Sequence, residues 1–66
     1  MKIYYMLEYR ENADDPWIID DDYIISLDEA LDCATSEALC HVNLEHRIVR
    51  WNAEEVLTIP RLEDHL

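Results

Sequence analysis

The sequence predicts an α+β domain of order ββαββ, with an antiparallel sheet of about four strands and one helix packed on one face. Two segments rich in β-forming residues precede a single amphipathic helical segment, and two more β-forming segments follow it. Strands that are interrupted by only one helix favour an antiparallel sheet with that helix on one side. The 66 residues are enough for one small domain, over residues 1–66.

The first two predicted strands lie in the N-terminal half. Residues 2–10, KIYYMLEYR, are rich in aromatic and β-branched side chains, so they predict a strand with alternating faces. Residues 11–16, ENADDP, predict a turn or loop. Residues 17–25 hold the apolar pieces WII and YII, separated by three aspartates. We expect an interrupted or bulged strand there, paired antiparallel with the first. Trp17, Ile18 and Ile19 are the candidates that fix it to the core, with Ile18 or Ile19 favoured over Trp17.

A capping box predicts the start of the helix. Ser26 and Glu29 have the S-x-x-E spacing in which each residue binds the backbone amide of the other, so the helix should begin at Leu27. It should end near His41, and in a chain without glycine Asn43 is the expected left-handed residue after it. At 100° per residue, one apolar stripe faces the core. The stripe consists of Leu27, Ala30, Leu31, Ala34, Ala38 and Val42.

The C-terminal third predicts a hairpin. Residues 47–51, RIVRW, and 56–59, VLTI, read as strands, and residues 52–55 as the turn between them. Pro60 should end the last strand. We expect residues 61–66 to form a short, frayed tail.

The net charge is unusually negative for a chain of this size. Sixteen acidic residues against five basic ones give −11, and eleven of the acids precede residue 38. Such asymmetry predicts one strongly negative surface that faces a cationic partner, and it disfavours direct binding to nucleic acid. Acidity that serves only solubility is the alternative.

The acidic residues of the first half are the candidate partner-binding residues. Side chains on one face of a strand are spaced by about 6.6 Å, close to the spacing of successive phosphates along one nucleic-acid strand. A row of carboxylates could therefore occupy a groove shaped for DNA, with Trp17 as an apolar anchor. The alternative is a solvated acidic face. The candidate carboxylates are Asp14, Asp15, Asp20, Asp21, Asp22, Asp28, Glu29 and Asp32.

Metal, cofactor and catalytic sites are not expected. The aspartates lack the alternation and the glycine of a calcium loop, and Cys33 and Cys40 lack zinc-ligand spacing. Cys40 and His41 are adjacent on a helix and point about 100° apart, so they do not form a nucleophile pair. We therefore expect no enzyme activity. The absence of a long apolar stretch predicts no signal peptide and no membrane span, and hence a cytoplasmic protein with free thiols.

Several short motifs carry a resemblance to small phage proteins. These motifs are the leading strand MKIYYMLEY, the S-L-x-x-A-x-x-x-A pattern from Ser26 to Ala34, the pair Cys40-His41, and R-I-x-x-x-N from Arg47. In layout and in these letters the chain resembles a group of phage proteins that includes anti-CRISPR proteins acting on type I surveillance complexes. Some members are basic on the surface, so no contact residue is carried over. The resemblance implies an inhibitor that binds a Cas protein in the host cell cytoplasm.

A second resemblance keeps another function open. The first strand and the S-L-D-E-A-L helix start also resemble small antitoxins that pair with RNA-cleaving toxins. The expected function is a stoichiometric inhibitor that blocks DNA binding by charge mimicry. The alternative is an antitoxin-like or other acidic protein-interaction module. Apolar side chains on the outer face of the first strand, Tyr4 and Met6, would also suit a homodimer.

Overall fold

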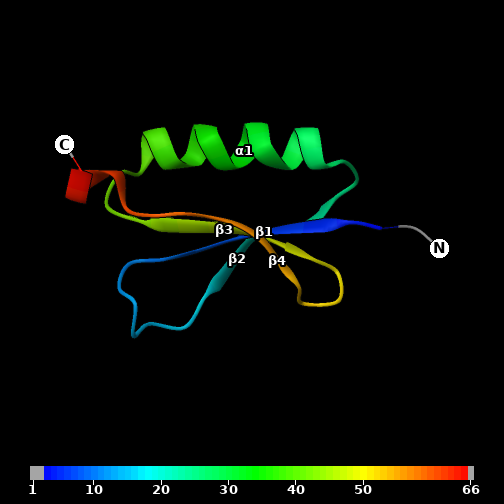
Figure 1. The fold of residues 1–66 in the computed structure, drawn as a ribbon, viewed down its shortest axis with the longest axis horizontal. Coiled ribbons are helices and arrows are strands. Elements are labelled where there is room, and N and C mark those ends of the chain that lie inside the picture. Colours follow the sequence, from blue (N-terminus) through cyan, green and yellow to red (C-terminus); the bar gives the residue numbers. More distant parts are fainter. Residues whose placement is uncertain (1–2, 66) are drawn as a thin grey trace.

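The fold is a four-stranded antiparallel sheet with one helix on one face, in the order ββαββ, as predicted. The computed structural model describes residues 3–65. The strand order is β2-β1-β3-β4, and every pair of neighbours is antiparallel. Figure 1 shows α1 lying across one side of the sheet, while no helix covers the other side. The elements are β1 (Tyr5–Arg10), β2 (Ile18–Ile24), α1 (Leu27–Cys40), β3 (Glu45–Arg50), β4 (Glu55–Ile59) and a 3-10 helix, η1 (Leu62–His65).

The core lies between α1 and the two central strands. Strands β1 and β3 pair without interruption from Tyr5 opposite Arg50 to Arg10 opposite Glu45. This register sets Leu7 opposite Ile48, and both side chains are fully buried. The helix contributes buried alanines from the predicted stripe. Because alanine is short, the helix axis can approach the sheet closely enough to exclude water.

The helix begins as predicted, with half of the capping box in place. The Ser26 hydroxyl accepts a hydrogen bond of 3.1 Å from the backbone amide of Glu29. The reciprocal bond from the Ser26 amide to the Glu29 carboxylate is not formed within residues 3–65. The helix ends at Cys40, and His41 caps it with φ of −130° and ψ of 70°, which is neither helical nor extended; its backbone amide donates to the Glu37 carbonyl. The left-handed conformation expected for Asn43 is wrong, because Ala53 is the residue with positive φ among residues 3–65 and the non-helical His41 ends the helix instead.

The β3–β4 turn places an alanine in the left-handed region. Ala53 has φ of 67° and is the one non-glycine residue with positive φ among residues 3–65. The β-carbon of an L-residue crowds the following carbonyl in this region, which costs about 1–2 kcal/mol.

We expect Ala53→Gly to raise the free energy of unfolding by up to about 1 kcal/mol, because glycine relieves the crowding but makes the unfolded chain more flexible. Urea denaturation measures the difference. Ala13→Gly is the matched control, in an exposed loop without positive φ, and it should be neutral or slightly destabilising. A loss of stability in Ala53→Gly equal to that of Ala13→Gly would contradict the expectation.

Strand β2 is an edge strand with two bulges. Seven residues, Ile18–Ile24, lie opposite the five residues Tyr5–Tyr9 of β1, and register shifts occur on both sides of Leu7. Ile24 is buried, but Ile18 and Ile19 are 50% and 54% exposed. The expectation that Ile18 or Ile19 fixes this strand to the core is therefore wrong. Ile24 does so instead, and the bulges shift the strand so that the two earlier isoleucines miss the helix.

The other strand boundaries differ from the predictions by a few residues. Strand β1 begins at Tyr5, and the predicted start at Lys2 lies outside the described residues. Strand β3 begins at Glu45 because the ladder with β1 continues to the Arg10–Glu45 pair. Pro60 follows the last residue of β4, as predicted.

The C-terminal tail is tied to the domain, which corrects the expected fraying. Residues Leu62–His65 form η1, and the Glu63 amide donates a 2.9 Å hydrogen bond to the Val42 carbonyl. The Arg61 guanidinium also donates a 3.2 Å bond to the Glu11 carbonyl. These two bonds link the tail to the end of α1 and to the β1–β2 loop. No helix within residues 3–65 is long and apolar enough to cross a membrane.

Candidate functional site

The open face of the sheet carries Trp17 stacked on two arginines of the same chain. The guanidinium carbons of Arg10 and Arg47 lie 4.1 and 4.4 Å from the centroid of the Trp17 ring. Arg10 bonds Glu45 at 2.7 Å, and Arg47 bonds Glu8 at 2.7 Å. Each pair joins β1 to β3, since these residues belong to the two neighbouring strands. The β1–β2 loop thus folds back to cover the sheet with its aromatic ring.

This placement gives Trp17 a role inside the molecule. Its side chain is half-buried, and cation–π contacts with two arginines hold it against the sheet. Sequence reasoning missed both partners, because Arg10 and Arg47 are far apart in the chain and converge only through the β1–β3 register. Its role as an anchor for a partner protein stays a prediction.

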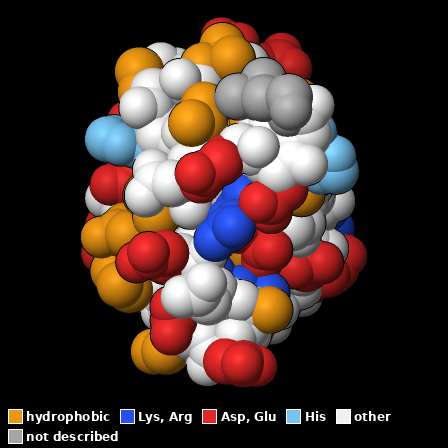
Figure 2. All heavy atoms as spheres, turned by 90° about the vertical axis from the view of Figure 1, so that its left-hand side faces the viewer, with side chains coloured by type: hydrophobic (Ala, Val, Ile, Leu, Met, Phe, Trp, Pro, Cys, Tyr) orange, Lys and Arg blue, Asp and Glu red, His pale blue; other side chains and the backbone are white. Residues whose placement is uncertain are grey.

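The acidic residues divide into paired and unpaired groups. Every arginine bonds a carboxylate of its own chain: Arg10 with Glu45, Arg47 with Glu8 and Glu55, Arg50 with Glu54, and Arg61 with Asp64. Figure 2, which views the end at the left of Figure 1, shows arginine or lysine side chains surrounded by acidic ones. Within residues 3–65, none of the eight predicted partner-binding carboxylates takes part in an ion pair. The acids without an ion pair in this part of the chain therefore include the whole predicted set, together with Glu11 and Glu63.

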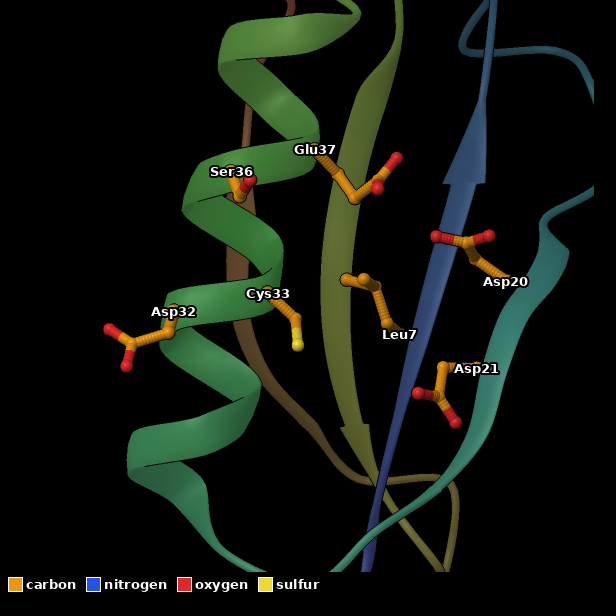
Figure 3. A pocket seen from close by; sticks show the side chains of 7 residues that line it. All are labelled: Leu7, Asp20, Asp21, Asp32, Cys33, Ser36 and Glu37. Carbon is orange, nitrogen blue, oxygen red and sulfur yellow. The ribbon is translucent and has the colours of Figure 1, made fainter.

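Part of that set lines a groove between β2 and α1. The first hollow of the groove has a volume of about 370 Å³. Figure 3 shows Asp20 and Asp21 reaching from β2 towards the helix, and Glu37 and Cys33 reaching from α1 towards the strands. Leu7 of β1 lies between them, whereas Asp32 points away from the strands. We call this feature the acidic groove; its first hollow is lined by Leu7, Asp20, Asp21, Asp32, Cys33, Ser36 and Glu37.

A second hollow continues the acidic groove towards the end of the helix. It has a volume of about 190 Å³ and shares Asp20 and Glu37 with the first. His46 of β3 lines it and is only 1% exposed, and its Nδ1 atom has no hydrogen-bond partner among the described residues. Tyr9, His41 and Leu44 complete the lining. A buried polar side chain without a partner is uncommon in proteins.

The remaining predicted residues lie elsewhere. Asp14 and Asp15 belong to the β1–β2 loop, and a 3.1 Å bond from the Asn12 amide to the Asp15 carboxylate shapes this turn. Asp28 and Glu29 lie in the first turn of α1. Figure 1 places the loop and the start of α1 at opposite ends of the molecule. Asp22 lies on β2 and lines neither hollow of the groove. The structure therefore brings together Asp20, Asp21 and Asp32, and not the whole predicted row.

Glu37 is the groove residue that sequence reasoning missed. It comes one helical turn after Cys33 and lines both hollows. The i+4 spacing puts the two residues on one side of the helix. This spacing is visible in the sequence and could have indicated that Glu37 lies beside Cys33. The side of the helix that β2 would face could not be read from the pattern, because β2 contributes its residues through bulges.

The charges in the groove act on the thiol of Cys33. Partial burial raises the pKa of Cys33, and the carboxylates of Glu29, Asp21, Asp32 and Glu37 raise it further because they disfavour the thiolate. The thiol stays protonated at neutral pH and is a poor nucleophile. Both cysteines are free. The same field that disfavours an anion on Cys33 favours a cation in the groove.

The pH dependence of folding should report on His46. Burial lowers the pKa of His46 below 6.5. The nearby carboxylates of Glu37 and Asp20 and a hydrogen bond with the Leu44 backbone offset part of this effect, while His41 adds to it. The unfolded state therefore binds more protons than the folded state once the pH falls to about 6.5. The stability present above that pH should be lost as the pH falls towards the folded pKa, with a slope of at most about 1.4 kcal/mol per pH unit.

Urea denaturation from pH 7.5 to about pH 5.5, above the usual range of carboxylates, tests this expectation. His46→Leu removes the titrating ring from the same buried position and should flatten the profile over this interval. His65→Gln is the control, since His65 is exposed at the C-terminal end, and its profile should follow that of the unmodified chain. An unchanged slope in His46→Leu would assign the pH dependence to another group.

No set of three or more His, Cys, Asp or Glu side chains within residues 3–65 is arranged to hold a metal ion. No family model, curated protein or solved structure matches this chain.

Proposed function

We propose that this protein is a binding inhibitor that presents its acidic groove and the adjoining carboxylates of β2 to the cationic surface of a nucleic-acid-binding protein complex. The chain competes with DNA for arginines and lysines of that complex and has no catalytic role. A CRISPR effector is the proposed target class, in line with the resemblance to small phage anti-CRISPR proteins. The setting is then the cytoplasm of a host cell.

One observation carries this proposal. The chain pairs every arginine with one of five carboxylates, and the eight predicted binding carboxylates stay without an ion pair in the described part of the chain. Neutralising those charges internally would lower self-repulsion, so leaving them free has a cost in stability. A partner that supplies the missing cations offsets this cost when it binds.

Exposed apolar side chains support a protein partner in particular. Ile18, Ile19, Tyr23 and Ile25 lie in or next to β2, and each is at least half exposed. Apolar groups beside charged ones are typical of protein interfaces, in which a desolvated centre is surrounded by polar contacts. The same observation favours the second candidate function, an antitoxin-like interaction module that binds a protein without imitating DNA.

Competition at varied salt concentration separates the two candidates. A purified type I surveillance complex is incubated with its DNA target, and displacement of the DNA by this protein is followed by gel shift. The mimic should displace DNA, and its affinity should fall steeply between low salt and about 0.15 M, because screening weakens contacts between exposed charges. Binding that neither displaces DNA nor responds to salt would reject DNA mimicry and leave the interaction module.

A further inference from the structure

Two carboxylates from different elements face each other across the acidic groove. Asp20 comes from the edge strand β2 and Glu37 from the third turn of α1, and both line the two hollows. Figure 3 shows their carboxylate groups turned towards the same space above Leu7. The nearest cationic candidate is His41, whose Nε2 lies 3.6 Å from the Glu37 carboxylate at an exposed position. No arginine of the described chain bonds either Asp20 or Glu37.

A buried polar group lies beside these carboxylates. His46 is 1% exposed, lines the second hollow with Asp20 and Glu37, and has an Nδ1 atom without a hydrogen-bond partner in the described residues. A neutral imidazole carries one acceptor and one donor nitrogen. Leaving such a group unsatisfied costs about 1–3 kcal/mol. The hollow therefore combines negative charge with one imidazole nitrogen that has no partner among the described residues.

The shape of the groove selects among cations. A volume of about 370 Å³ in the first hollow is far more than one metal ion needs. The protonated thiol of the half-buried Cys33, above the buried Leu7, offers an apolar floor along which a methylene stem can lie. A guanidinium is planar, carries five N–H donors and is more weakly hydrated than an ammonium group. It can therefore bond two carboxylates at once, where a lysine would act as a single, strongly hydrated charge.

We propose that the acidic groove is a receptor for one arginine side chain of a partner protein, with the guanidinium between Asp20 and Glu37 and the stem on Leu7 and Cys33. Asp21 and His46 border the bound group from β2 and β3. This inference rests on the proposed function and deepens it, because it replaces a general electrostatic surface by one defined contact. Glu37, outside the predicted row of carboxylates, becomes a binding residue.

A titration with single amino-acid probes tests the receptor directly. The ¹⁵N-labelled protein is titrated at low salt with N-acetyl-arginine amide, and then with N-acetyl-lysine amide. We expect saturable shifts of the amide signals of Asp20, Cys33, Glu37 and His46, and at least threefold tighter binding of the arginine probe. Equal affinity for both probes, or shifts spread evenly over all acidic residues, would overturn the receptor and indicate general charge screening.

Isosteric variants identify the contacts. Asp20→Asn combined with Glu37→Gln should lower the affinity for the arginine probe at least tenfold. Glu11→Gln combined with Glu63→Gln is the matched control, since it removes the same charge from two exposed positions outside the predicted binding set, and it should change the affinity less than twofold. The dispersion of the amide spectrum shows whether each variant stays folded. Equal weakening by both pairs would overturn the receptor.

The DNA competition assay separates this inference from the proposed function. If Asp20→Asn/Glu37→Gln displaces DNA as well as the unmodified chain, the arginine receptor is rejected and DNA mimicry stands. If the unmodified chain binds the arginine probe in the groove but never displaces DNA, the receptor stands and the proposed target is rejected.

Discussion

Replacing Arg47 by methionine is expected to lower the free energy of unfolding by about 2–3 kcal/mol, a large part of the stability of so small a domain. Arg47 bonds Glu8 at 2.7 Å and stacks on Trp17. Glu8 is 9% exposed, so its carboxylate would remain in a dry site without its partner. Urea denaturation followed by tryptophan fluorescence measures the loss, and Trp17 itself should report the change in its surroundings.

A double variant shows whether the loss of stability comes from the Glu8 carboxylate that is left buried without a partner. Glu8→Leu combined with Arg47→Met replaces the whole pair by apolar side chains and should recover most of the lost stability. Arg50→Met is the matched control, because Arg50 and Glu54 form an exposed pair at 3.6 Å, and such pairs contribute about 0–1 kcal/mol. If the double variant is as unstable as Arg47→Met, the stacking on Trp17 rather than the Glu8 pair is responsible.

Reversing the charge of Asp20, Asp21 and Asp22 to lysine is expected to weaken displacement of DNA from the target complex at least a hundredfold. The three side chains are exposed on an edge strand, so the fold should survive. Lysine on an edge strand also discourages pairing with other chains, as aspartate does. Gel-shift competition measures the effect, and circular dichroism checks the fold.

A control with the same change in net charge separates location from total charge. Glu11→Lys, Glu54→Lys and Glu63→Lys alter three exposed carboxylates outside the predicted binding set, in the β1–β2 loop, in the β3–β4 turn and on η1. This variant should lose less than tenfold in affinity, through weaker long-range steering alone. Equal losses in the two triple variants would mean that net charge, and not the β2 cluster, determines inhibition.

The fold was accessible from the sequence because its elements are locally encoded. Ser26 marks the start of α1, the alanine stripe marks its buried face, and alternation in β1 places Leu7 in the core. The exposure of Ile18 and Ile19 could not be predicted from the sequence in the same way. It depends on bulges that form only when β2 pairs with β1, and an apolar run alone does not contain that information.

The candidate site could be predicted from the sequence only in part, for a related reason. The abundance of aspartate predicted a negative surface, and Asp20, Asp21 and Asp32 do line one groove. Glu37 and His46 join them from α1 and β3, and their convergence follows from how the helix crosses the sheet. Trp17 was expected to face a partner, yet it lies on two arginines that the β1–β3 register brings together.

The surplus length of β2 has a consequence for how this protein can change over evolution. Seven of its residues span the distance of five in β1, so a deletion of one residue would straighten the strand and turn the side chains beyond it to the opposite surface. Such a descendant would keep almost the same isoelectric point and yet lose Asp20 from the side of Glu37. For this fold, the surface on which an acid lies depends on its spacing along β2 and not on the number of acids.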